Sequence, residues 1–480
     1  MIQLFNSLSG KKEILEQPKK GPLHFFVCGP TVFDYSHIGH ARTYAAFDTF
    51  VKYLRSKKWK IIYLQNITDV DDKIIDRAKS FHEDPLRYAH KFEELYKKDM
   101  ESISCDSVTR YARATDHIKN IVQQIQTLIL KGNAYFIDQA GYYFDINSFP
   151  DYGKLSRRTA LQAEDAVTRI DEQIKKRNKG DFALWKYVSV PEKENKKKFV
   201  VINGEPAWNT PIGWGRPGWH IEDTAITEHW FGSQYDIHGG GGDLKFPHHE
   251  AEIAQQESAS GKVSFVKIWL HTGSLRINGE KMSKSLKNFL TIRDFLAHHK
   301  KNVLRLIITM HHYRTPIQWS DSLVEQATQG VDAFLGTYDA LACSQGLKIK
   351  QTKNIKIQWE EIEETFKKEF DEAMSDDLNT PEAVAALFTY TTMIRTIAWK
   401  ISKSHAKKSQ KTLTFALKIL GIDTEEYKIP STITKLVKQR ELYRDNKQFT
   451  HADTLRNQVD TLGYIIEDTP IGPFVRKKAS

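Results

Sequence analysis

The sequence has few cysteines and no long apolar run. Its 480 residues include only three cysteines, Cys28, Cys105 and Cys343. Three widely spaced cysteines in so long a chain do not make a disulfide framework, which indicates a reducing compartment. No stretch approaches the ~18 apolar residues of a membrane-spanning helix, and residues 1–20 lack the apolar core of a signal peptide. The sequence therefore predicts a cytoplasmic protein without membrane contact.

Charge and length set further limits. The 70 Lys and Arg residues exceed the 60 Asp and Glu residues, which gives a formal net charge of +10. A modest basic excess favours a polyanionic partner, although a basic enzyme without nucleic acid is also compatible with it. A chain of 480 residues exceeds the usual size of one domain, so two or three domains are expected.

Residues 25–43 read as strand, loop and helix. The apolar run from His24 to Val27 predicts a buried strand, and Cys28-Gly29-Pro30 is a turn signal that ends it. His37 and His40 then fall three apart in the first turn of a helix, so they share one face. Two imidazoles at a helix N-terminus make a plausible phosphate site. The spacing alone also fits an ordinary pair of surface or core histidines.

The rest of the first half continues as an α/β pattern. Residues 60–67 predict a second strand and residues 68–72 the start of a helix, which together indicate a parallel sheet. Residues 134–146 predict a hairpin around Ala140-Gly141. Residues 154–205 look irregular and basic. Within them we interpret the charge run 192–198 as a solvated surface loop, with a tRNA-contacting loop as the minority interpretation.

The second half turns from glycine-rich and basic loops to helices. Residues 235–257 predict a strand, a turn of four glycines and a helix from about Pro247, and such a turn lets a nucleotide approach the backbone. Lys281 and Lys284 lie three apart in a polar loop, which suits phosphates. From Ile292 the pattern is helical almost to the end, with a domain boundary near 320–340. The expected helices cover 301–310, 321–347, 358–375, 381–402, 409–420 and 432–463.

Taken together, these motifs resemble cysteinyl-tRNA synthetases, a family of class I aminoacyl-tRNA synthetases. His37-Ile38-Gly39-His40 and Lys281-Met282-Ser283-Lys284-Ser285 match the two signatures of that class. The stretches CGPTVFDYSHIGHART, NITDVDDKI, GRPGWHIE, YDIHGGGGDLKFPHHE and KMSKSLKNFLTIRD narrow the resemblance to the cysteine family. The likeness extends through AMSDDLNTPEAVAALF and FTHADTLRNQVDTLGYIIEDTP to the end of the chain.

The resemblance implies a fold and a division of the chain. It implies an α/β, Rossmann-like parallel-sheet catalytic domain over residues 1–320, with a connective insertion at about 110–205. An all-α tRNA-binding domain would follow, with a helical anticodon-binding part at 321–425 and a tRNA-contacting tail at 426–480. The segment 187–204 looks longer than is usual for the family, and we expect it to protrude. The family expectation for the oligomeric state is a monomer.

The resemblance also implies the reaction and its residues. Cysteine and ATP form cysteinyl-adenylate with loss of pyrophosphate, and tRNA(Cys) then takes the cysteinyl group. His37 and His40 would donate to the phosphates, and Lys281 and Lys284 would hold the β- and γ-phosphates of ATP, which carries Mg²⁺. Gly39 would leave room for adenine. The implied ATP-binding residues are Gly39, His40, Gly240, Asp243 and Lys284, and the implied cysteine-binding residues are Gly29, Thr68 and Trp219.

Selection of cysteine over serine implies a zinc ion. Zinc binds a thiolate strongly, whereas an apolar pocket separates the two side chains poorly. The matching ligand positions are Cys28, Asp223, His248 and Glu252, of which the last two are i, i+4 on one helix. Asp223 departs from the family, which usually has cysteine there, but it keeps the charge and offers an oxygen that zinc accepts. A three-ligand site, a weaker or different metal, and loss of the metal remain as alternatives.

Three other functions are compatible with parts of this pattern. One is the related ligase that joins cysteine to an amino-sugar in thiol biosynthesis, which lacks the helical rear that residues 330–480 supply here. Another is a tRNA-binding paralogue that has lost catalysis, against which the intact His37, His40, Lys281 and Lys284 argue. The third is a synthetase with altered amino-acid specificity, which the aspartate at 223 leaves open.

Overall fold

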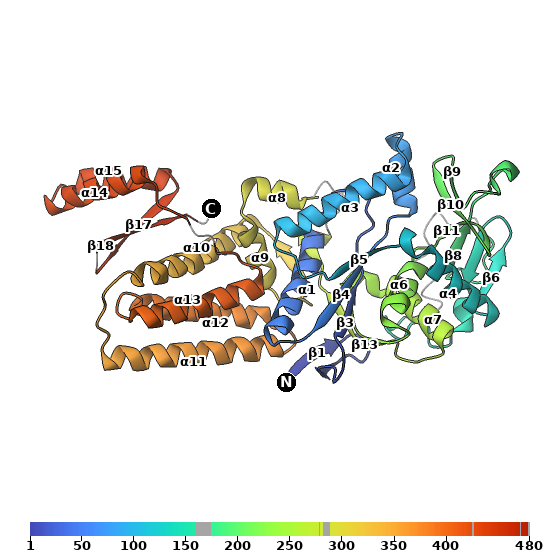
Figure 1. Ribbon diagram of the computed structural model, residues 1–480, viewed down its shortest axis with the longest axis horizontal. Helices are drawn as coiled ribbons and strands as arrows, with labels where there is room; N and C mark the ends of the chain where they lie inside the picture. Colours follow the sequence, from blue (N-terminus) through green and yellow to red (C-terminus); the bar gives the residue numbers. More distant parts are fainter. Residues whose placement is uncertain (159–173, 278, 282–288, 425–426, 471, 479–480) are drawn as a thin grey trace. The chain divides into compact units, whose positions relative to one another are not determined.

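The computed structural model describes residues 1–158, 174–277, 279–281, 289–424, 427–470 and 472–478 (Figure 1). The chain divides into two compact units. The first comprises Met1–Leu275, Lys281–Arg293 and Arg314–Pro316, and the second comprises Arg276–Glu280, Asp294–Tyr313 and Ile317–Ser480. No helix in the described residues is long and apolar enough to cross a bilayer.

A five-stranded parallel sheet forms the centre of the first unit. Its strand order is β13-β12-β3-β4-β5. Phe25 and Phe26 of β3 are both fully buried, as expected for a parallel strand that is covered on both faces and so shows no polar alternation. The predicted strands at 24–27 and 60–67 and the parallel sheet are confirmed. The strands are β3 (Leu23–Val27), β4 (Ile61–Ile67), β5 (Arg110–Arg113), β12 (Tyr235–Gly241) and β13 (Val266–Thr272).

Helices pack on this sheet and on one another. Local signals set several of their ends: Asp71 accepts from the amide of Lys73 to cap α2, and Asp84 caps α3, which has Pro85 in its first turn. The apolar stripe of α4 meets α6 and α7 in one core cluster with Ile221 and Ala251. The helices of the first unit are α1 (Ile38–Ser56), α2 (Asp72–Ser80), α3 (Pro85–Ser102), α4 (Ile118–Leu130), α6 (Ile221–Phe231) and α7 (His248–Ser260).

A six-stranded antiparallel sheet lies between β5 and α6 in the sequence, in the order β6-β7-β8-β11-β10-β9. The predicted hairpin around Ala140-Gly141 is confirmed as β6 and β7. The expectation of irregular structure over 154–205 is wrong for β8 and β9. β8 lies inside the sheet and four of its residues in a row are buried, so its sequence shows no alternation of apolar and polar residues. The basic residues on either side of it made the segment look irregular. The strands are β6 (Ala134–Ile137), β7 (Gly141–Phe144), β8 (Phe182–Tyr187), β9 (Phe199–Ile202), β10 (Glu205–Thr210) and β11 (Gly213–Pro217).

Short elements complete the first unit. The charge run at 192–198 contains a 3-10 turn whose residues are not buried, in keeping with a surface segment. A two-stranded hairpin opens the chain. These elements are β1 (Ile2–Asn6), β2 (Lys11–Leu15), η1 (Thr115–His117), η2 (Ile146–Ser148), η5 (Glu192–Glu194) and η6 (Gly242–Lys245).

The second unit is mainly helical. A buried polar network joins three of its helices, because Glu363 of α11 accepts from Tyr390 of α12 and from Ser409 and Thr412 of α13. The helices are α8 (Ile292–His298, begun in the first unit), α9 (Lys301–Thr309), α10 (Asp321–Ser344), α11 (Lys353–Ser375), α12 (Thr380–Ile397), α13 (Lys403–Leu420), α14 (Ser431–Asp445) and α15 (Phe449–Thr461). Three short strands form a sheet in the order β15-β14-β16, with bounds β14 (Leu275–Ile277), β15 (Glu280–Lys281) and β16 (Ile317–Trp319).

The C-terminal part differs from the expected helix over 432–463. It forms two helices, α14 and α15, separated by a turn in which Lys447 adopts a positive φ of 59°. A hairpin of β17 (Tyr464–Thr469) and β18 (Gly472–Lys477) follows, so the rear of the chain is not entirely helical. Ile433, Val437, Val459 and Ile466 form a small core of this segment. The helical pattern concealed the break because both helices place apolar residues on the same core.

The four glycines at 239–242 also differ from the predicted turn. Gly239 to Gly241 belong to β12 and pair with β13, and Gly239 also pairs with β3. A Cβ at Gly239 would lie 2.7 Å from Cζ of Phe47 on α1, and one at Gly240 would lie 2.6 Å from Cε1 of His249 on α7. These glycines therefore let two helices approach the strand closely.

We expect Gly239→Ala to lower the free energy of unfolding by about 1–3 kcal/mol, the usual effect of overpacking a tight core. The added methyl would collide with the buried Phe47 ring. The strand that carries Gly239 is hydrogen-bonded to β3 and β13, so its backbone has little room to move away. Urea denaturation measures the change. Gly346→Ala is the matched control, because the nearest atom to its added Cβ is 3.3 Å away. Equal stability of the two variants would contradict the close approach of α1 to β12.

Candidate metal centre and active site

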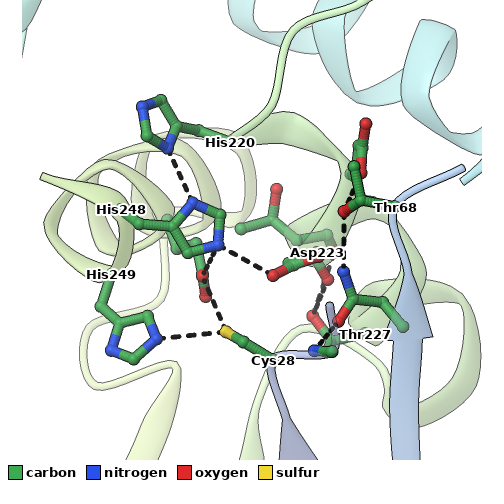
Figure 2. A network of polar contacts seen from close by, with 12 residues as sticks. Cys28, Thr68, His220, Asp223, Thr227, His248 and His249 are labelled. Carbon is green, nitrogen blue, oxygen red and sulfur yellow. Dashed lines mark hydrogen bonds and ion pairs between the residues drawn. The ribbon is translucent and has the colours of Figure 1, made fainter. Parts of the chain in front are cut away.

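Four predicted side chains converge in the first unit, and Figure 2 shows three of them, Cys28, Asp223 and His248, close together. Cys28 is the first residue after β3. Asp223 lies in the first turn of α6, and α7 carries His248 and Glu252 one turn apart. The parallel sheet brings these elements together, because Val27 of β3 pairs with Gly239 of β12, after which the chain leads into α7.

The ligand atoms of Cys28, Asp223, His248 and Glu252 all lie within 4.8 Å of one another, and all four residues are buried. Nε2 of His248 is 2.9 Å from Oδ2 of Asp223 and 3.0 Å from Oε1 of Glu252. The sulfur of Cys28 is 3.7 Å from Oε1 of Glu252. One thiol, one imidazole and two carboxylates around one point form a donor set that suits a divalent transition metal.

The electrostatics of this cluster also fit a cation. Burial, and then the Glu252 and Asp223 carboxylates, raise the pKa of the Cys28 thiol well above its usual value. Burial raises the pKa of Glu252 as well. Burial acts to lower the pKa of His248, but Glu252 and Asp223 outweigh it and raise that pKa. Oδ1 of Asp223 is buried with no hydrogen-bond partner. A bound cation would satisfy this oxygen and reverse the penalty on the anionic forms.

A second set of ligand atoms shares two members with the first. Cys28, His238, His249 and Glu252 also hold their ligand atoms within 4.8 Å of one another. The sulfur of Cys28 lies 3.2 Å from Nε2 of His238 and 3.1 Å from Nε2 of His249. Sequence reasoning missed both histidines. The adjacent pair at 248 and 249 was a usable signal, whereas His238 lies in a strand buried on both faces and gave none.

Further side chains contact the histidines of both ligand sets on the ring nitrogens that face away from the ligand atoms. Nδ1 of His238 lies 2.7 Å from the Tyr235 hydroxyl, and Nδ1 of His249 lies 2.8 Å from Nε2 of His271. Nδ1 of His248 lies 2.8 Å from Nδ1 of His220, which leaves Nε2 of His248 directed at the carboxylates. Burial lowers the pKa values of His238, His249 and His271, which favours the neutral form of these imidazoles. Partners of this kind fix the orientation and tautomer of metal-binding histidines.

His37 and His40 form a reciprocal cap at the start of α1. The amide of His40 donates to Nδ1 of His37 at 3.2 Å, and the amide of His37 donates to Nδ1 of His40 at 3.3 Å. The rings stack 3.8 Å apart. Burial, followed by the charge of His37, lowers the pKa of His40 well below its usual value. A neutral imidazole that accepts at Nδ1 carries its proton on Nε2, so His40 presents an N–H donor on its other edge.

The segment after the second signature lies against the first. The amide of Ile38 donates to the carbonyl of Leu290, and the amide of Ile292 donates to the carbonyl of Ser36. His37 and Thr291 form an antiparallel bridge between these two bonds. Lys284 falls outside the described residues, and of Lys281 only the backbone, in β15, is described. The chain after the lysine loop thus returns directly to the N-terminus of α1.

The other predicted residues lie on α1, β12, η6, just after β3 and β4, and just before α6. Gly39 lies in the first turn of α1, Gly240 in β12, and Asp243 in the exposed turn η6. A Cβ at Gly29 would lie 1.7 Å from the carbonyl oxygen of Asn66, so only glycine fits there. Thr68 is buried at the end of β4, and the Trp219 ring stacks 4.4 Å from His248 with 39% of its surface exposed.

Known structures share this architecture. The methionyl-tRNA synthetase of Mycobacterium tuberculosis, solved with methionyl-adenylate, is similar with a TM-score of 0.57, 13% identity and coverage of 84% of this chain and 90% of that one. The leucyl-tRNA synthetase agnB2 of Agrobacterium radiobacter, solved in a ternary complex, gives a TM-score of 0.57 at 12% identity, with coverage of 84% and 85%. At these identities the likeness establishes the fold, that of class I synthetases.

Sequence comparisons identify the family. A family model described as the class I (C) tRNA synthetase catalytic domain matches residues 14–329, and one described as the DALR domain matches residues 369–424. The chain is 40% identical to the cysteine–tRNA ligase of Caldicellulosiruptor saccharolyticus over 99% of this chain and 100% of that protein. It is 41% identical to that of Thermoplasma volcanium over 97% of each, and 38% identical to that of Thermococcus gammatolerans over 98% of each. The chain therefore belongs to the cysteine–tRNA ligase family of class I aminoacyl-tRNA synthetases.

Proposed function

We propose that this protein joins L-cysteine to tRNA(Cys) through a cysteinyl-adenylate, with release of pyrophosphate and AMP. The observation that carries this proposal is the buried cluster of Cys28, Asp223, His248 and Glu252 in a chain of the cysteine–tRNA ligase family. The cluster supplies a means of recognising a thiol. The two histidines at the N-terminus of α1 supply a means of binding phosphate.

In the first step the cysteine carboxylate attacks the α-phosphorus of ATP, and the bond to pyrophosphate breaks. The protein's part is to position the reactants and to stabilise charge on the phosphate oxygens. His40 donates from Nε2–H, and His37 lies beside it in the same cap. Lys281 and Lys284 hold the β- and γ-phosphates of the Mg²⁺-bound nucleotide. The position of Leu290 and Ile292 against Ile38 and Ser36 supports this role, because it brings the chain that follows Lys284 to the N-terminus of α1.

The remaining nucleotide contacts come from the sheet edge. Gly39 leaves the first turn of α1 open for adenine, and Gly240 lies where β12 ends. Asp243 follows in η6 with an exposed carboxylate that can accept from the ribose hydroxyls. In the second step a ribose hydroxyl at the 3′ end of tRNA takes the cysteinyl group and AMP leaves.

Cys28, Asp223, His248 and Glu252 would hold one zinc ion. Bound there, zinc would coordinate the substrate thiolate and lower the thiol pKa from ~8.5, whereas an alcohol stays protonated at neutral pH. This set is the better candidate of the two because it contains Asp223, whose Oδ1 has no partner. It also adjoins the partly exposed Trp219, which stacks on His248. An ion that reads a substrate needs an accessible coordination position.

Residues near the ion would hold the rest of the amino acid. Gly29 and Thr68 lie just after β3 and β4, and Trp219 would form a wall of the site. We further propose that residues 321–425 bind the anticodon, that residues 426–480 also contact tRNA, and that the protein acts as a cytoplasmic monomer. The DALR-domain match at 369–424 supports the tRNA-binding role of the helical part, and the low cysteine content supports the cytoplasmic location.

ATP–pyrophosphate exchange tests the function directly. We expect exchange that depends on cysteine, with serine at least about a hundredfold weaker, because a metal discriminates between thiol and alcohol far better than an apolar pocket does. Transfer of cysteine to purified tRNA, measured in parallel, should follow. Exchange without charging of tRNA would favour the amino-sugar ligase, and no exchange with any amino acid would favour a non-catalytic paralogue. Equal exchange with serine would refute recognition of the cysteine thiol by a bound metal.

The metal assignment predicts that Asp223→Ala loses zinc and Asp223→Cys keeps it. Loss of a hydrogen-bond partner of a metal ligand usually weakens metal binding by about 10–100-fold. Removal of a ligand itself should weaken zinc binding by more than that. Zinc per chain, measured by mass spectrometry after dialysis against a weak chelator, checks both variants. Asp236→Ala is the control, because Asp236 is an acidic residue of β12 that pairs with Lys267. Zinc that survives in Asp223→Ala but is lost on replacing His238 would indicate the second ligand set.

The phosphate assignment predicts that His40→Ala and Lys284→Ala each lower the exchange rate by about 10²–10³, the usual cost of one transition-state donor. Binding of tRNA, measured by filter retention on the same preparations, should change little. His311→Ala serves as control, because His311 is a partly buried histidine whose ring contacts the Ile307 carbonyl in the second unit. A near-normal exchange rate in either variant would remove that residue from the mechanism.

A further inference from the structure

Arg293 is a charged residue that the reaction described above does not use. It lies at the start of α8, two residues after Thr291, which forms the bridge to His37. Its Nε donates to Oδ1 of Asp99 on α3 at 2.7 Å. The exposed fractions of the two side chains are very different, 42% for Arg293 and 4% for Asp99. A half-exposed guanidinium therefore reaches a buried carboxyl group of the first unit.

The same guanidinium contacts the loop that leads into α1. Its Cζ lies 5.0 Å from the centroid of the Tyr35 ring, a distance at which a cation and an aromatic ring attract each other. The Tyr35 ring packs edge-on against Phe92, again on α3, with centroids 5.5 Å apart. Three segments thus meet at one side chain: α3, the loop before His37, and the chain that follows the lysine loop.

The segment just before Arg293 contacts His37 by both backbone and side chain. The two backbone hydrogen bonds and the bridge described above hold residues 290–292 beside His37. The Phe289 ring lies edge-on to the His37 ring, with centroids 5.1 Å apart, and the His40 ring stacks on the same imidazole. The position of the His37 ring therefore depends on where this segment lies.

Helix α3 is a well-anchored attachment point for the segment. Tyr96 and Met100, on either side of Asp99 in the sequence, are buried in the first unit. Burial raises the pKa of Asp99, and the hydrogen bond and charge of Arg293 act against that rise. Without Arg293, the buried carboxyl group would lose its counter-charge and the segment would lose its attachment to α3.

We propose that Arg293 is a positioning residue for His37. It ties the chain after the lysine loop to α3 through Asp99, and the tied segment holds the His37 imidazole where the phosphates of ATP bind. The inference deepens the proposed function, because it assumes that ATP binds with its phosphates at His37 and His40. Arg293 itself touches no substrate in this assignment.

ATP–pyrophosphate exchange tests the role. Arg293→Ala should lower kcat/KM for ATP by about tenfold to a hundredfold, because a displacement of about 1 Å in a reacting group costs up to about 10²-fold. The KM for cysteine should stay at the wild-type value, since the contacts of Arg293 given above are with α3 and the loop before α1. Arg293→Lys keeps the charge and should recover part of the loss.

Asp99→Ala should reproduce the effect of Arg293→Ala. The double variant should be no slower than either single variant, because both substitutions remove the same contact. Asp99→Asn replaces Asp99→Ala if the latter does not fold, since it removes the charge and keeps the shape of the side chain.

Arg113→Ala is the matched control. Arg113 pairs with Glu93, a second buried acid of α3, at 2.6 Å, and the exposed fractions of 35% and 2% are close to those of the Arg293–Asp99 pair. This ion pair joins α3 to β5. Its loss should lower the unfolding temperature and leave the kinetics with ATP unchanged.

The outcomes separate a positioning role from its alternatives. A near-normal kcat/KM for ATP in Arg293→Ala would overturn the inference. So would a loss that the Asp99 variant does not share, because it would indicate that Arg293 contacts a substrate directly. An equal loss in Arg113→Ala would show a general effect of stability instead. Absence of cysteine-dependent exchange in the wild type would refute the proposed function, and the inference with it.

Discussion

The structure depends on the concentration of negative charge at the carboxyl edge of the parallel sheet. Cys28, Asp223 and Glu252 place one thiol and two carboxyl groups around a single imidazole, that of His248. Burial and mutual repulsion oppose the charged forms, as the raised pKa values of Cys28 and Glu252 indicate. Such a cluster is retained only if something else compensates for it, and a divalent cation is the simplest compensation.

The fold makes this arrangement rigid. Cys28 follows a strand that is buried on both faces, and the helices that carry Asp223, His248 and Glu252 pack on a shared core with α4. Gly239 and Gly240 let α1 and α7 approach β12 closely, since a Cβ at either position would collide with Phe47 or His249. The glycines thus set the distance between sheet and ligands, although they lie in a strand and not in a nucleotide-binding turn.

Sequence reasoning was strong where residues act through short spacing. The strands at 24–27 and 60–67 and the start of a helix at His37 and His40 follow from local pattern, whereas the family resemblance selected His248 and Glu252. Cys28 and Asp223 lie far apart in the chain, and only the family resemblance grouped them. Strand β8 could not be predicted because a central strand lacks alternation. The hairpin of β17 and β18 was missed because the helical pattern was taken to continue almost to the end of the chain.

The histidines that contact the metal-ligand candidates also could not be predicted from local sequence pattern. His238, His249, His220 and His271 come from β12, α7, the start of α6 and β13, and no periodicity connects them. Only the pairing of β12 with β13 brings His249 within hydrogen-bond distance of His271. A site composed of side chains from separate strands is therefore a property of sheet order, which short-range patterns do not encode.

The aspartate at 223 can be understood from the same charges. Cysteine and aspartate each contribute one negative charge when ionised, so the set keeps a net charge of −3 with a neutral His248. Aspartate differs in having a second oxygen. Oδ2 contacts Nε2 of His248 at 2.9 Å, while Oδ1 is without a hydrogen-bond partner and can accept a cation. The neighbouring Glu222 has the same half-satisfied form. The first turn of α6 thus presents two buried carboxyl groups that each have one oxygen without a hydrogen-bond partner.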